Sequence, residues 1–209
     1  MKQLTIEEVR KTKIQEIGIQ ITTKCNFNCK HCFVKNKHIN TKDIDINKLK
    51  QILDIIELSH VRKILILGGE ISLKPTLIKS VLELLKTKCA NANIILFSNG
   101  SNIKPLIDIV EPFSNLKLGL VLSDTSYHKM NSNYKDIEEE VLPQIPDDIF
   151  KLGIETIIDE KLKIFKSDLS DLSKEDMSGI GINASGNIYP DSCIIPDTKS
   201  SEDELANIS

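Results

Sequence analysis

The sequence predicts an α/β protein that folds as a single domain, a partial, TIM-like (β/α)6 barrel. Short apolar runs alternate along the chain with longer stretches in which apolar residues recur every three or four positions, the pattern of strands separated by helices. The 209 residues suffice for one sizeable core and are few for two. Such strands pair in parallel through right-handed crossovers, and six units are too few for a complete eight-stranded barrel. A doubly wound open sheet is the structural alternative.

The predicted strands are short apolar runs rich in β-branched residues. They cover residues 16–23, 63–67, 93–98, 117–123, 152–158 and 179–184.

The predicted helices are amphipathic, with apolar residues at i, i+3, i+4 and i+7. The first covers residues 47–58, and the second follows Pro75, a residue suited to a first helical turn. The third is marked by Ile103, Leu106, Ile107 and Val110, and the fourth by Tyr134, Ile137 and Val141, with its end near Pro143; a short fifth covers residues 168–175.

The predicted domain organisation is simple. Residues 1–15 form an N-terminal segment, residues 16–195 form the barrel, and residues 196–209 contain few apolar side chains and are expected to be a disordered tail.

Composition excludes several classes of protein. No stretch of about 18 uninterrupted apolar residues is present, and the first residues are charged where a signal peptide is apolar, so we expect a cytoplasmic protein without a membrane partner. The net charge is −3 and the lysines are scattered, which gives no electrostatic case for a nucleic-acid partner. Because cytoplasmic thiols stay reduced, clustered cysteines there indicate metal or redox chemistry rather than disulfides.

Three of the five cysteines stand together in "KCNFNCKHCF", directly after the first predicted strand. Cys25, Cys29 and Cys32 have the spacing C-x3-C-x2-C, and thiolates are the usual ligands of iron–sulfur clusters and soft metals. A zinc site with His31 as fourth ligand is the alternative, although His31 directly precedes Cys32, a tight geometry for two ligands of one tetrahedral ion. Three thiolates on a four-iron cluster leave one iron open to a small molecule.

The triplet resembles the signature of the radical S-adenosylmethionine (SAM) superfamily, and the resemblance extends over about residues 16–195. It implies that Cys25, Cys29 and Cys32 bind a [4Fe–4S] cluster and are the catalytic residues, with His31 beside them in the cofactor site. The open iron would chelate SAM, and an electron supplied by a flavodoxin or ferredoxin type of donor would cleave SAM to methionine and a 5′-deoxyadenosyl radical.

Two further motifs follow the second and third strands. Gly68, Gly69 and Glu70 resemble the family's GGE motif, which holds the SAM amino group, although Ile71 replaces the usual proline. Ser98 and Asn99, in "LFSNG", resemble a segment near the SAM carboxylate and ribose. Taken without the cysteines, each motif is also ordinary turn chemistry.

The later motifs concern the substrate side. Ser123, after the fourth strand, would face SAM or substrate, and the roles of Asp124 and His128 stay open between site and surface. The "GNIYPDSC" run resembles the start of the C-terminal extension of peptide-modifying members, but Cys193 and Cys89 cannot supply the four thiolates of an auxiliary cluster. We expect Cys89, which follows a helix, to be a buried or half-buried hydrophobe.

The resemblance therefore predicts a radical SAM enzyme that abstracts hydrogen from a peptide or protein substrate. A small-metabolite or nucleotide-derived substrate and the activation of a glycyl-radical enzyme are the alternatives within the family. A non-catalytic iron–sulfur or zinc-binding scaffold is the alternative of a different class.

Overall fold

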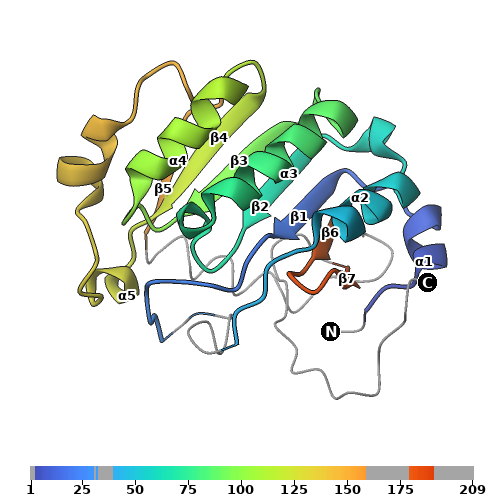
Figure 1. The fold of residues 1–209 in the computed structure, drawn as a ribbon, viewed down its shortest axis with the longest axis horizontal. Coiled ribbons are helices and arrows are strands. Elements are labelled where there is room, and N and C mark those ends of the chain that lie inside the picture. Colours follow the sequence, from blue (N-terminus) through green and yellow to red (C-terminus); the bar gives the residue numbers. More distant parts are fainter. Residues whose placement is uncertain (1–2, 31, 33–39, 159–178, 191–209) are drawn as a thin grey trace.

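A computed structural model describes residues 3–30, 32, 40–158 and 179–190 of the chain. These residues form one seven-stranded sheet in the order β5-β4-β3-β2-β1-β6-β7 (Figure 1). Every neighbouring pair is parallel except β6 and β7. The strands are β1 (Glu16–Gln20), β2 (Lys63–Leu67), β3 (Asn93–Ser98), β4 (Lys117–Ser123), β5 (Ile154–Ile157), β6 (Gly179–Ile182) and β7 (Ile188–Tyr189).

The first four strands start in one row. Glu16 pairs with Lys63, Lys63 with Asn93, and Asn93 with Lys117, so each strand begins at a polar residue and enters the core at the next position. Because the four strands run in parallel from this common start, their carboxyl ends meet at the same edge of the sheet, where functional residues gather in α/β folds.

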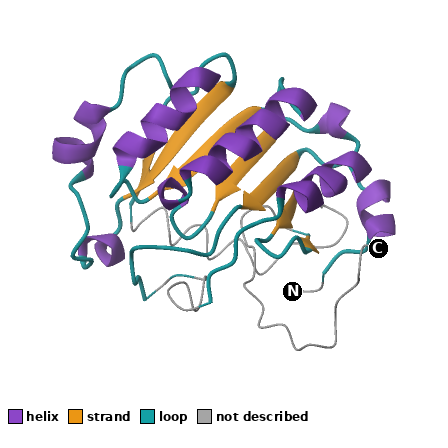
Figure 2. Cartoon of the chain, viewed as in Figure 1, coloured by secondary structure: helices purple, strands orange, loops and turns teal. Residues whose placement is uncertain are grey.

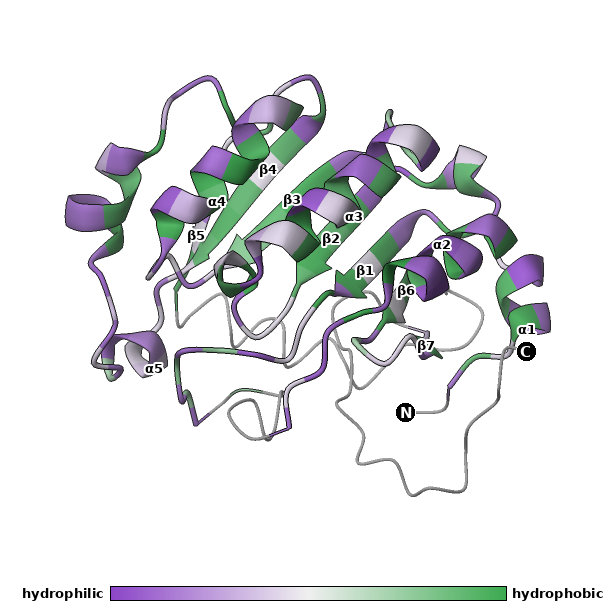
Figure 3. Cartoon of the chain, viewed as in Figure 1, coloured by the Kyte–Doolittle hydropathy of each residue, from purple (hydrophilic) through white to green (hydrophobic). Residues whose placement is uncertain are grey.

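Three helices cover one face of this sheet: α2 (Ile46–Ile55), α3 (Pro75–Lys88) and α4 (Ile103–Val110) (Figure 2). The side chain of Asp45 caps the first turn of α2, and Pro75 stands in the first turn of α3. Each helix turns an apolar side toward the strands and a polar side outward (Figure 3). Placing all three crossover helices on one face is the arrangement of a partial barrel, and it rules out the doubly wound alternative.

Most predicted elements are confirmed, with changes at their ends. β2, β3 and β4 have the predicted bounds, whereas β1 ends at Gln20 because the chain turns to pair Thr22 with Asp43. The fourth helix is a short π-helical turn, η4 (Ile137–Val141), followed by a 3-10 turn, η5 (Leu142–Gln144), that contains Pro143.

Two α-helices and one strand of the described residues were missed: α1 (Ile6–Lys11), α5 (Ser126–Lys129) and β7. The 3-10 turns η1 (Leu58–His60), η2 (Ile71–Leu73) and η3 (Glu111–Phe113) were not predicted either. The pairing of β6 beside β1 was also not predicted. The predicted fifth helix at 168–175 and the predicted tail at 196–209 lie outside the described residues. In the part of the chain that the structure describes, no helix is both long and apolar enough to cross a bilayer.

Candidate functional site

The cysteines lie in a loop that crosses the carboxyl edge of the sheet. We call residues 24–32 the cysteine loop; residue 31, the predicted cofactor-binding His31, lies outside the described part. From β1 the chain runs past the ends of β2, β3 and β4 toward α5 (Figure 1). Contacts with the segments after all three strands fix this path, and they are described in turn below.

The three thiols belong to one short segment. Cys25 is buried, Cys29 and Cys32 are half-buried, and all three are reduced. The Cys32 N–H donates to the Cys29 carbonyl at 3.2 Å, so these two residues share one turn. Among the described residues, no three His, Cys, Asp or Glu side chains are grouped so as to hold a single metal ion. A four-iron cluster binds each thiolate on a different iron, and its ligands therefore stand farther apart than those of one ion. Three reduced thiols on one loop fit such a cluster.

The GGE loop (Gly68–Glu70) packs directly on the start of the cysteine loop. The Gly69 N–H donates to the Thr22 carbonyl at 2.9 Å, and the Glu70 N–H donates to the Lys24 carbonyl at 2.7 Å. A Cβ at position 69 would lie 2.2 Å from the Lys24 oxygen, so only glycine permits this approach. The end of β2 thereby fixes where the cysteine loop begins.

The Glu70 side chain joins the ends of β2 and β3. Its carboxylate is 1% exposed, and it accepts from Ser98 Oγ at 2.8 Å, the Asn99 N–H at 2.7 Å and the Ser72 N–H at 3.0 Å. These donors compensate the cost of burying a carboxylate. The carboxylate is therefore turned into the protein, and in this geometry it organises the GGE loop and the SNG turn (Ser98–Gly100).

The SNG turn and Ser101, the residue after it, contact the cysteine loop. Asn26 Nδ2 donates to Ser101 Oγ at 2.7 Å, and Asn99 Nδ2 donates to Asn26 Oδ1 at 3.1 Å. Gly100 has φ +74°, a backbone conformation that side chains disfavour, and it completes the turn. Both ends of the Asn26 amide are thus bonded, one residue from Cys25.

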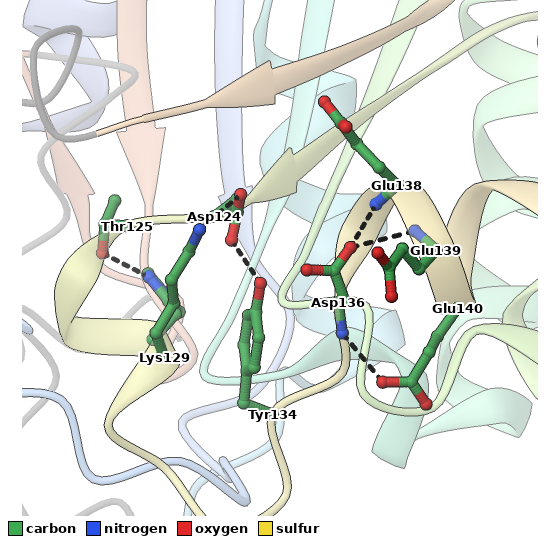
Figure 4. Close-up of polar contacts among 9 residues, drawn as sticks. Asp124, Thr125, Lys129, Tyr134, Asp136, Glu138, Glu139 and Glu140 are labelled. Atoms are coloured by element: carbon green, nitrogen blue, oxygen red, sulfur yellow. Dashed lines mark hydrogen bonds and ion pairs between the residues drawn. The ribbon is translucent and has the colours of Figure 1, made fainter.

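The segment after β4 is the third segment that borders the cysteine loop. Ser123 ends β4 and is half-buried, and Asp124 accepts from the Tyr134 hydroxyl at 2.7 Å and pairs with Lys129 at 3.3 Å (Figure 4). Burial, together with the hydrogen bond to Asp124, raises the pKa of Tyr134 well above its usual range. His128 Nδ1 lies 2.6 Å from Thr125 Oγ1, and the His128 ring lies beside Phe27 of the cysteine loop, with ring centroids 5.9 Å apart.

Cys89 stands apart from this edge. It follows the C-terminus of α3, is 7% exposed, and packs in the apolar core with the helix residues. Burial raises the pKa of its thiol to about 11, because the charged thiolate loses hydration there. The expectation that Cys89 is buried among hydrophobic residues is confirmed. Cys193 lies outside the described residues.

The contacting residues that the sequence reasoning missed include Asn26, Ser101 and Asn131. Asn26 and Ser101 directly follow Cys25 and the SNG turn, so the types and places of these residues were available signals. Asn131 carries no local signal, since only the fold brings it against the cysteine loop, where its amide contacts Asn28 and Cys29.

The described residues form a partial parallel barrel that is covered by helices on one face and has three cysteines at its carboxyl edge. This arrangement is typical of barrel proteins whose cofactor site lies at that edge. The chain belongs to the radical SAM superfamily, whose family profile matches residues 19–170. Members of this family use a [4Fe–4S] cluster and SAM, and these are the cofactors of the chain.

Curated relatives share parts of the chain. A candidate glycyl-radical enzyme activating enzyme of Methanocaldococcus jannaschii is 37% identical over 92 residues, 44% of this chain and 34% of that protein. An uncharacterized protein of the same organism is 32% identical over 82 residues, 39% of this chain and 28% of that protein. A candidate GTP 3′,8-cyclase of Thermoplasma volcanium is 29% identical over 89 residues, 42% and 26% of the two chains. The matched segments thus span about a quarter to a third of these relatives.

Solved structures share the fold. BtrN in complex with AdoMet and 2-DOIA superposes with a TM-score of 0.57 at 16% identity, covering 86% of this chain and 73% of BtrN. An open conformation of BtrN gives a TM-score of 0.51 at 14% identity, covering 87% and 71% of the two chains. At these identities the likeness concerns the fold alone, and it agrees with the predicted partial barrel.

Substituting Gly69 tests the packing of the two loops. In Gly69→Ala the new methyl collides with backbone atoms of Lys24, and we expect a loss of about 1–3 kcal/mol in the free energy of unfolding. Gly68→Ala is the matched control, because its nearest contacts are 3.1–3.2 Å away and need a shift of only a few tenths of an ångström. Urea unfolding of the two variants measures the difference. Equal losses would show that the close approach at Gly69 is not required.

Substituting Glu70 tests the buried carboxylate. In Glu70→Gln one carboxylate oxygen is replaced by an NH2 group. If the NH2 group takes the place of Oε2, it faces the Asn99 N–H; if it takes the place of Oε1, it faces the Ser98 hydroxyl and the Ser72 N–H. In either case a donor faces a donor, and a buried hydrogen bond is lost. We expect a loss of about 1–3 kcal/mol in urea unfolding. Glu83→Gln, on the exposed side of α3, is the control and should be neutral. A neutral Glu70→Gln would contradict the organising role of the carboxylate.

Proposed function

We propose that this chain is a radical SAM enzyme that binds a [4Fe–4S] cluster through Cys25, Cys29 and Cys32 and abstracts hydrogen from a substrate bound at the carboxyl edge of the barrel. The observation that carries the proposal is the meeting of the cysteine loop with the GGE loop and the SNG turn. Two backbone bonds and the Asn26 amide bring these motifs together although they are far apart in sequence.

The proposed roles of the chain's residues follow from this arrangement. When bound, the cluster supplies the electron that cleaves SAM into methionine and a 5′-deoxyadenosyl radical. Gly69 lets the cysteine loop pack directly on the GGE loop, whose Gly68 and Gly69 are proposed to contact the methionine end of SAM, while the buried Glu70 carboxylate keeps the SNG turn in place. Ser98 and Asn99, with His31, complete the proposed cofactor site.

The polar residues after β4 are proposed to face the substrate side. Ser123 ends the strand, and Asp124 is held by Tyr134 and Lys129 at the same edge. The pKa of Tyr134 is raised, so its hydroxyl keeps its proton and continues to donate to Asp124 over the physiological pH range. These fixed groups give the substrate side of the edge a defined polar surface.

A peptide or protein substrate stays our prediction from the sequence. One relative is named as a candidate activator of a glycyl-radical enzyme, which is itself a protein, and this favours a protein substrate. Another relative is named as a candidate GTP 3′,8-cyclase, which keeps a nucleotide-derived substrate as the second candidate. A one-electron donor is required in either case.

SAM cleavage tests the proposal directly. After anaerobic reconstitution with iron and sulfide, dithionite and SAM should yield 5′-deoxyadenosine, measured by liquid chromatography. Cys29→Ala should lower both iron content and 5′-deoxyadenosine to background, because one of the three thiolate ligands is lost. Cys89→Ala is the matched control, since that thiol lies in the core, and it should retain both.

Two results would contradict the proposal. Iron binding without any 5′-deoxyadenosine would favour a non-catalytic scaffold, and full activity of Cys29→Ala would show that the cysteine loop does not hold the cluster.

A further inference from the structure

Asn131 lies two residues beyond α5, and its side-chain amide contacts the cysteine loop with both of its ends. Its Oδ1 accepts from the Asn28 N–H at 2.7 Å, and its Nδ2 donates to Cys29 Sγ at 3.4 Å. The residues that meet here are about a hundred positions apart in the sequence. The segment after β4 therefore donates a hydrogen bond to Cys29 Sγ, one of the three proposed ligand sulfurs.

The Asn131 amide has enough hydrogens to donate to Cys29 Sγ as well as to its other acceptors. Nδ2 carries two hydrogens, and three acceptors lie near it: the Tyr127 carbonyl at 2.9 Å, the His128 carbonyl at 3.2 Å and Cys29 Sγ at 3.4 Å. The two carbonyls belong to successive residues of α5 and can share one hydrogen in a three-centre bond. The second hydrogen is then left for the sulfur.

A second contact keeps this segment against the cysteine loop. The rings of Phe27 and His128 have centroids 5.9 Å apart and planes inclined at 51°. Phe27 is 1% exposed, and the short contact between Thr125 and His128 fixes the imidazole. The α5 segment thus packs on three successive residues of the cysteine loop: Phe27, Asn28 and Cys29.

We propose that Asn131 is a positioning residue that raises the reduction potential of the cluster by donating a hydrogen bond to the Cys29 sulfur. Reduction adds negative charge that is shared by the cluster and its thiolates. An N–H donor stabilises the reduced form more than the oxidised form, and the potential becomes less negative. The inference rests on the proposed function, because it assumes that Cys29 is a cluster ligand. The segment after β4 would then control how readily the cluster accepts an electron.

Two substitutions test the hydrogen bond in the reconstituted protein. Asn131→Asp keeps an oxygen to accept from the Asn28 N–H but lacks the donor, whereas Asn131→Leu has similar size and neither group. Asn133→Asp is the matched control, because it adds the same charge two residues away on an exposed side chain. The midpoint potential is measured by anaerobic redox titration followed by electron paramagnetic resonance, with iron and sulfide counted per chain.

The expected result is a more negative midpoint potential in Asn131→Leu and a still more negative one in Asn131→Asp, with Asn133→Asp like the wild type. Unchanged potentials in cluster-loaded variants would overturn the proposal. A shift in Asn131→Asp alone would also overturn it, since charge would then be the cause. Loss of the cluster from both variants would assign Asn131 to loop assembly instead. Absence of an iron–sulfur cluster from the wild type would mark failure of the proposed function itself.

Discussion

The buried carboxylate of Glu70 is the interaction on which the arrangement of the site depends. Parallel pairing brings the ends of β2 and β3 to one edge, but it does not fix the loops that follow them. A carboxylate is buried at low cost only where hydrogen-bond donors surround it, and here they come from both loops: the Ser72 N–H on one side, and Ser98 and Asn99 on the other. The GGE loop and the SNG turn are therefore fixed as one unit.

That unit then determines the path of the cysteine loop. The loop is held at its start by the Glu70 N–H on the Lys24 carbonyl, in its middle by the Asn26 amide, and toward its end by Asn131. Because each contact comes from the segment after a different strand, the loop crosses the edge in a defined direction. The positions of the three thiols are therefore set by contacts of the cysteine loop with the rest of the protein. Metal binding need not organise the whole loop.

The strands could be predicted from the sequence, and the candidate site residues picked out in it, because both have local signals. β2, β3 and β4 are uninterrupted apolar runs, and the cysteines, Gly69 and Glu70 have fixed spacing. α1 was missed although Thr5 and Glu8 form a capping box, a signal that was present in "TIEE". The pairing of β6 with β1 was missed because it is a non-local choice between two sheet edges, and strand patterns are the same for either edge. The buried orientation of the Glu70 carboxylate depends on Ser98 and Asn99, so no local pattern could reveal it.

The carboxyl edge divides into a proposed cofactor half and a proposed substrate half, and the motifs with local signals lie mostly in the first. The cofactor half is built from the ends of β1, β2 and β3, whose loops bond to one another and contain the motifs. The half after β4 contains its own network of Asp124, Tyr134 and Lys129, and it contacts the cysteine loop through Asn131 and through the rings of Phe27 and His128. A change in the β4 segment can therefore alter the proposed substrate surface while Glu70 and Asn26 keep the cysteine loop in place. Through the hydrogen bond from Asn131 to Cys29 Sγ, such a change would also reach one of the proposed ligand sulfurs.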